Sequence, residues 1–177
     1  WCEITNGVAS NDCGSVSGNA LYFNGAGDRL AATEAIDASA GGTLHFSLKI
    51  GSGAFPCDNA DPGENVVLEY STNGCAGPWE VISTFYESSY SEFTNLNIPI
   101  PAAAETAQSH FRWRQLANSG NNQDNWALED VYIGISNPGD FDFLWTPDYN
   151  LDDNGISNPV ASPMEDTVYY VEVVDAN

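Results

Sequence analysis

The sequence predicts an all-β fold, a jelly-roll β-sandwich followed by a small C-terminal β appendage. Three observations support this prediction. Short runs in which apolar and polar residues alternate recur along the 177-residue chain, and such alternation is typical of strands with one buried face. Turns rich in Gly, Pro, Asn and Ser separate these runs. No segment keeps a helical period for three turns, so a helical bundle is not expected.

The predicted strands follow one another through the first three quarters of the chain. The clearest covers residues 43–51, where apolar residues alternate with polar ones and place His45 and Lys49 on the non-core face. One short helical turn is expected at residues 102–108. Further strands are expected at residues 19–23, 65–74, 79–86, 93–101, 110–116 and 127–135.

The character of the sequence changes near Asn137, which suggests two domains. Residues 1–136 form the expected jelly roll, and residues 137–177 a short β segment, a linker or a partial module. Pro147, Pro159 and Pro163 punctuate residues 143–166, and residues 167–175 then alternate as a terminal strand. About 40 residues are too few for an independent sandwich, so this part must pack on the first domain or be a truncated module. The abrupt ends of the sequence suggest an excised piece of a longer protein.

The charge of the chain excludes some partners. The 25 acidic residues against four Lys and Arg give a formal net charge of −21. Such a surface repels nucleic acid and anionic membranes. No run is long enough for a membrane span and no signal peptide is recognised, so neither nucleic-acid binding nor membrane insertion is expected.

The four cysteines, Cys2, Cys13, Cys57 and Cys75, indicate disulfides of an exported protein. Three pairings are possible. We favour the near-neighbour scheme, Cys2–Cys13 and Cys57–Cys75, because it closes two short loops. Zinc binding is the weaker alternative, because the sequence has no CxxC pair and both histidines lie far from the cysteines along the chain.

Residues 13–135 carry a series of motifs in a fixed order and spacing. The pieces are CGSVSGNALYFNGAGDRLAAT, GGTLHFSLKIG, ENVVLEYSTNG, IPIPAAA, FRWRQ and DNWALEDVYIG, with Trp79 between the third and fourth. They resemble the reelin-type repeat, a galactose-binding-like jelly roll. The Trp-x-Pro and Asn-Pro-x-Ala-x-Pro motifs of residues 141–175 are similar to segments of large secreted surface adhesins of bacteria. Together these resemblances imply a repeating unit of a giant exported adhesin.

The resemblance also implies structural calcium. In related jelly rolls a carboxylate entering the last strand binds the ion, together with oxygens near the first strand. The matching positions are Glu129 or Asp130 and, for the first strand, Asp28. Relatives usually have Asp at the first of these positions, so Glu129 departs from the pattern. The alternative is that all three are solvated acids at strand ends.

Arg112 and Arg114 are half of the four Lys and Arg residues and lie two apart on one predicted strand. Their side chains, with Lys49, are expected on one outward face if the two strands share a sheet. The face could bind a glycan through the arginines, with Tyr86 and Tyr90 stacking on sugar rings. The alternative, which we favour, is internal pairing of the arginines with Glu69 and other acids.

Catalysis is not expected. The sequence has no Gly-x-Ser-x-Gly motif and no recognisable nucleophile with its base. Two classes remain for this secreted or cell-surface protein. One is a binding module for a polysaccharide or cell-surface glycan, and the other is a structural spacer repeat that contacts only neighbouring modules of the same long chain.

Overall fold

The structure is a computed structural model that describes residues 1–53, 55–134 and 141–175. The chain divides into two compact units, Trp1–Ile135 and Ser136–Asn177. The start of the expected second domain, residues 137–140, lies outside the described residues. Each unit is described by itself below.

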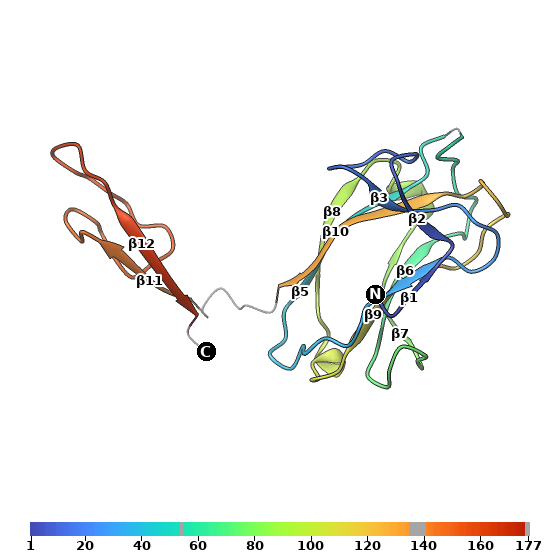
Figure 1. The fold of residues 1–177 in the computed structure, drawn as a ribbon, viewed down its shortest axis with the longest axis horizontal. Coiled ribbons are helices and arrows are strands. Elements are labelled where there is room, and N and C mark those ends of the chain that lie inside the picture. The colour runs from blue at the N-terminus through green and yellow to red at the C-terminus, as the bar shows by residue number, and fades with distance from the viewer. Residues whose placement is uncertain (54, 135–140, 176–177) are drawn as a thin grey trace. The chain divides into compact units, whose positions relative to one another are not determined.

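Unit 1 is built from two antiparallel sheets that face each other (Figure 1). Short 3-10 turns, η1 (Glu87–Ser89) and η2 (Ala102–Ala104), connect some of the strands, and the second lies where the helical turn was expected. Sheet A has the order β1 (Glu3–Thr5), β4 (Leu30–Ala32), β9 (His110–Gln115), β6 (Val66–Ser71) and β7 (Glu80–Phe85). Sheet B has the order β2 (Gly7–Ser10), β3 (Ala20–Phe23), β10 (Trp126–Gly134), β5 (Thr43–Ile50) and β8 (Thr94–Pro99). The predicted all-β jelly-roll fold is confirmed.

The core lies between the two sheets and is filled by the apolar side of each alternating strand. Phe46 of β5 meets Trp113 of β9 edge-on, with ring centroids 5.3 Å apart. Phe23 of β3 stacks on Trp126 of β10 at 3.9 Å. These large side chains are almost fully buried, and removing their apolar surface from water is the main force that holds the sheets together.

The N-terminal segment belongs to both sheets. β1 pairs with β4 in sheet A, and β2 pairs with β3 in sheet B. Asn6 joins the two strands with a φ of 55°, a left-handed conformation that Asn adopts more readily than most residues. The Asn6 side-chain amide donates hydrogen bonds to the carbonyls of Ala26 and Asp28, at 2.9 and 2.8 Å. These bonds hold the crossing point against the β3–β4 loop.

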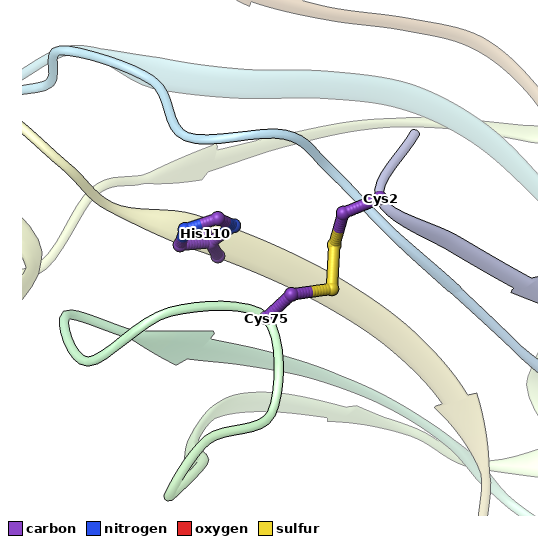
Figure 2. A group of neighbouring side chains, drawn as sticks. All are labelled: Cys2, Cys75 and His110. Carbon is purple, nitrogen blue, oxygen red and sulfur yellow. A yellow bond between two sulfur atoms is a disulfide. The ribbon is translucent and has the colours of Figure 1, made fainter.

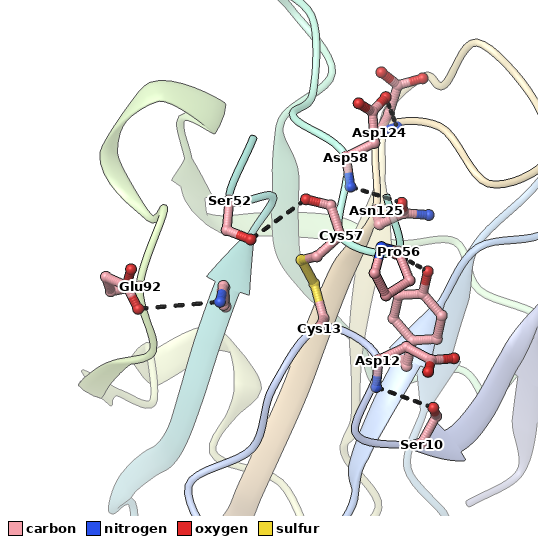
Figure 3. The surroundings of a disulfide bond; sticks show 12 residues. Ser10, Asp12, Cys13, Ser52, Pro56, Cys57, Asp58, Glu92, Asp124 and Asn125 are labelled. Atoms are coloured by element: carbon pink, nitrogen blue, oxygen red, sulfur yellow. Dashed lines mark hydrogen bonds and ion pairs between the residues drawn. A yellow bond between two sulfur atoms is a disulfide. The ribbon is translucent and has the colours of Figure 1, made fainter. Parts of the chain in front are cut away.

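The predicted near-neighbour pairing of the cysteines is wrong. The disulfides are Cys2–Cys75 and Cys13–Cys57 (Figures 2 and 3). The reason is the crossing just described, because Cys2 precedes a strand of sheet A and Cys13 follows a strand of sheet B. Likewise Cys57 follows β5 of sheet B, and Cys75 follows β6 of sheet A. Each cysteine therefore bonds to the one on its own sheet.

Unit 2 contains an antiparallel pair, β11 (Phe141–Thr146) and β12 (Tyr170–Asp175). β12 lies within the terminal strand that the alternation predicted. A bridge between Leu151 and Ala161 ties the connecting segment together, and the Trp145 indole donates to the carbonyl of Ile156 at 2.9 Å. Within the described ranges of both units, no helix has the length and apolar character needed to cross a membrane.

Candidate functional site

The outer face of sheet B carries a hollow of about 550 Å³, which we call the β10 groove. Its side chains come from three adjacent strands, because His45 of β5 lies opposite Tyr132 of β10 and opposite Asn97 of β8. One step along the sheet, Ser47 lies opposite Asn95. The residues that define the groove are His45, Ser47, Asn95, Asn97, Asp130 and Tyr132.

Aromatic rings form one side of the groove. The rings of His45 and Tyr132 stack with centroids 4.3 Å apart and planes 6° apart. Tyr132 is 59% exposed, although it stands on a central strand of the sheet. An exposed, stacked pair of rings on adjacent central strands is a surface on which a flat, partly apolar ligand can stack.

Amide groups form the opposite side of the groove. Ser47 donates to Oδ1 of Asn95 at 2.6 Å, and Nδ1 of His45 lies 2.6 Å from Oδ1 of Asn97. Both contacts use the amide oxygens and fix the two side chains. Within the described part of the chain neither NH₂ group donates to another protein group, so both can donate to a ligand.

A β-bulge in β10 produces this arrangement. From Glu129 to Tyr132 the strand advances three residues while β5 advances only two, from Ser47 to His45. The extra residue is Asp130, whose φ is 52°, and its exposed side chain lines the groove. Without the extra residue, strict alternation would turn Tyr132 toward the core.

Arg112 and Arg114 lie on the outer face of sheet A, where both bind one carboxylate. Arg112 contacts Glu69 at 2.7 Å, and Arg114 contacts the other oxygen of the same carboxylate at 2.8 Å. Burial raises the pKa of Glu69, but hydrogen bonds from the two arginines outweigh this and lower it. The Arg112 guanidinium also lies 4.2 Å from the centre of the Trp79 ring. The internal pairing considered from the sequence is therefore present.

Lys49 does not join the arginines, so the expected shared basic face is wrong. β5 belongs to sheet B and β9 to sheet A, and the alternation of a strand indicates its faces but not its neighbours. Lys49 instead lies with its ammonium group 4.0 Å from the carboxylate of Glu92. Of the predicted stacking residues, Tyr86 is 60% exposed, whereas Tyr90 packs edge-on against buried Phe85 at 5.6 Å.

The residues predicted to bind calcium are not gathered around one point within the described chain. The Glu129 carboxylate accepts hydrogen bonds from the backbone amides of Val16 and Ser17, both at 2.6 Å, and so anchors the loop after Cys13. Asp130 lies in the β10 groove, and Asp28 is exposed in the β3–β4 loop. Glu129 therefore has a structural contact that accounts for its carboxylate.

Another carboxylate cluster was not predicted from the sequence. Carboxylate oxygens of Asp61, Glu64 and Asp124 lie within 4.8 Å of one another, and Glu64 and Asp124 are buried. Burial raises the pKa of Glu64, and its contact with Asp124 raises it further. The signal in the sequence was the acid-rich loop of residues 58–64, but its partner Asp124 is distant along the chain. Cys2, Cys75 and His110 are also close together, but both sulfurs form the disulfide (Figure 2).

Arg29 holds the loop that carries Asp124. Its side chain is fully buried, and burial lowers the pKa of its guanidinium. The guanidinium donates to the backbone carbonyls of Gly25, Gly120 and Asp124 at 2.6–2.7 Å and to the Gln115 side chain at 3.0 Å. These bonds fix the position of Asp124 beside Glu64.

Two facing antiparallel sheets with this strand order define a jelly-roll β-sandwich. Residues 6–134 match the family model of Reelin subrepeat B, and the chain belongs to this family. The resemblance of residues 13–135 to a reelin-type repeat is thereby confirmed. The similarity of residues 141–175 to bacterial adhesins stays a prediction.

Solved structures of similar fold include carbohydrate-binding modules. CBM27-1 of Caldicellulosiruptor saccharolyticus, solved with mannohexaose, has a TM-score of 0.48 and 15% identity, covering 77% of this chain and 85% of that one. A family 16 carbohydrate-binding module has a TM-score of 0.46 and 10% identity, covering 72% and 84%. At these values the similarity concerns the fold, and the ligand must be argued from the β10 groove.

Proposed function

We propose that unit 1 is a non-catalytic module that binds a polysaccharide or cell-surface glycan in the β10 groove. The observation that carries the proposal is the exposed His45–Tyr132 pair beside the NH₂ groups of Asn95 and Asn97. Sugar rings have an apolar face that packs on aromatic rings and hydroxyl groups that accept from amides, so the groove offers both kinds of contact. The predicted glycan role of Arg112 and Arg114 receives less support, because Glu69 already occupies both guanidinium groups.

The same proposal places the module in a large exported bacterial surface protein, secreted or displayed on the cell. Two disulfides support an oxidising compartment. Membership of the reelin family and the adhesin-like segment of unit 2 support an array of neighbouring modules. The net charge of −21 keeps such a surface soluble and disfavours nucleic acid as a partner.

We also propose a structural calcium ion, bound by the Asp61, Glu64 and Asp124 cluster and not by the residues named from the sequence. Asp61, Glu64 and Asp124 fit the ion, because calcium prefers carboxylate oxygens. Buried Glu64 and Asp124 repel each other when both are ionised, and a bound cation would remove this repulsion. Such an ion would join the loop of residues 58–64 to the loop before β10 and stiffen that end of the sandwich.

The experiment that tests glycan binding compares two tyrosines of nearly equal exposure. The wild-type chain, Tyr132→Ala and Tyr86→Ala are applied to a glycan array and to gels containing immobilised polysaccharide. We expect retention of the wild type and of Tyr86→Ala, and loss of retention for Tyr132→Ala. Retention lost only in Tyr86→Ala would move the site to the η1 loop. Silence of all three proteins would contradict the proposal and favour the spacer repeat.

A further inference from the structure

We infer that the binding site continues from the β10 groove, past the bulge, into a second hollow beside Trp1, so that the module recognises an internal stretch of a neutral polymer. This inference rests on the proposed function and specifies its ligand. The second hollow, which we call the Trp1 hollow, has a volume of about 320 Å³ and is lined by Trp1, Ile36, Tyr132 and neighbouring residues.

The two hollows share a wall. Tyr132 lines both the β10 groove and the Trp1 hollow. A third hollow, of about 290 Å³, adjoins them, because it is lined by Trp1 together with Asp130 and Val131 of the bulge. The bulged segment of β10 is thus bordered by depressions on several sides. A single sugar ring would use one depression, whereas a chain could follow them around the bulge.

Trp1 is suited to be a second stacking residue because its position is fixed and its surface is partly open. It is 48% exposed, and its ring packs edge-on against buried Trp113 at 6.1 Å. The adjacent Cys2 bonds to Cys75 and donates its amide hydrogen to the carbonyl of Ala32 at 2.9 Å. An aromatic side chain held in this way binds with little loss of conformational entropy.

The charge of the lining specifies the kind of polymer. Asp130 lines the β10 groove, Glu129 and Asp130 line the third hollow, and Glu34 lines the Trp1 hollow. Among the described residues that line these three hollows, none is Lys or Arg. Carboxylates or sulfates on a ligand would be repelled here, so an uncharged chain is favoured over a uronic-acid or sulfated one.

The test is calorimetric titration of the full chain with neutral β-linked manno- and gluco-oligosaccharides of two and six units. We expect the hexamer of at least one series to bind more tightly than its dimer. Loss of one stacking contact is worth about three- to tenfold in affinity. Trp1→Ala should therefore weaken hexamer binding by about that factor and leave dimer binding unchanged. Trp1→Phe should still bind the hexamer more tightly than the dimer. Trp79→Ala should do the same, because it removes an indole that packs on Arg112 and not one that lines any of the three hollows.

The possible results separate this inference from the proposed function. Equal affinity for dimer and hexamer, with binding still lost in Tyr132→Ala, would overturn the Trp1 hollow and leave the β10 groove as the site. Failure of all the oligosaccharides to bind would overturn the inference, as would tighter binding of a hexamer of uronic acid. If Trp1→Ala also lowers the melting temperature, its weaker hexamer binding would be attributed to folding. The ratio of hexamer to dimer affinity in Trp1→Phe would then decide, because loss of the preference for the hexamer in that variant would overturn the inference.

Discussion

The ion cluster of sheet A allows a prediction of stability. Glu69 is 3% exposed and neutralises both Arg112 and Arg114, so Glu69→Ala leaves two adjacent cations without a counter-charge. Removing one partner of a buried ion pair costs about 3–5 kcal/mol. The Arg112 and Arg114 side chains are 14% and 29% exposed and can regain water, which lowers the expected loss of unfolding free energy to about 2–3 kcal/mol.

Urea unfolding followed by the fluorescence of the buried Trp113 and Trp126 measures this loss. For a unit of this size it corresponds to a fall in melting temperature of about 6–12 °C. The control replaces all three charges, as Glu69→Leu with Arg112→Met and Arg114→Leu, and should lose much less because no unpaired charge remains. A loss below about 0.5 kcal/mol for Glu69→Ala would refute the reasoning.

The remaining predictions concern calcium and the disulfides. The pKa of Glu64 is raised in the folded state, so folding favours its protonated form. In the absence of calcium, the free energy of unfolding should therefore fall as the pH rises from the ordinary Glu pKa through the raised one. At a pH above the raised pKa, added calcium should restore the melting temperature. Glu64→Gln should remove both the pH dependence and the response to calcium. A melting temperature that a chelator leaves unchanged would exclude the ion. Mass spectrometry of unreduced proteolytic fragments should find Cys2 linked to Cys75 and Cys13 to Cys57; a fragment joining Cys2 to Cys13 would contradict the fold.

Local pattern was sufficient to predict most strands of unit 1. Apolar and β-branched runs, with clear alternation at residues 43–51 and 110–115, marked the strands that became β5 to β10. The strands that were missed are short. Glu3–Thr5, Gly7–Ser10 and Leu30–Ala32 have three or four residues each, too few to show a period. They become strands by pairing with partners distant along the chain.

Neighbour relations could not be predicted from local pattern. Placing Lys49 beside Arg112 required the order of strands in the sheets, and pairing Cys2 correctly required the crossing at Asn6. The candidate site was missed for a related reason. His45 was correctly expected to face outward, but its partner Tyr132 faces outward only because Asp130 adds a residue to β10. The one local hint was the Asp itself, because Asp tolerates a positive φ better than most residues.

The Cys2–Cys75 disulfide has a mechanical consequence. The two cysteines are 73 residues apart, and the second disulfide lies inside the same stretch. Tension that enters the chain at Trp1 passes through the sulfur bridge directly to the turn after β6, so the enclosed residues cannot be pulled straight. At about 3.4 Å per extended residue, the residues between the two cysteines would span roughly 250 Å, and the disulfide prevents this length from being pulled out. Under load, β1 to β6 would stay within a covalent loop while only the later strands could lengthen.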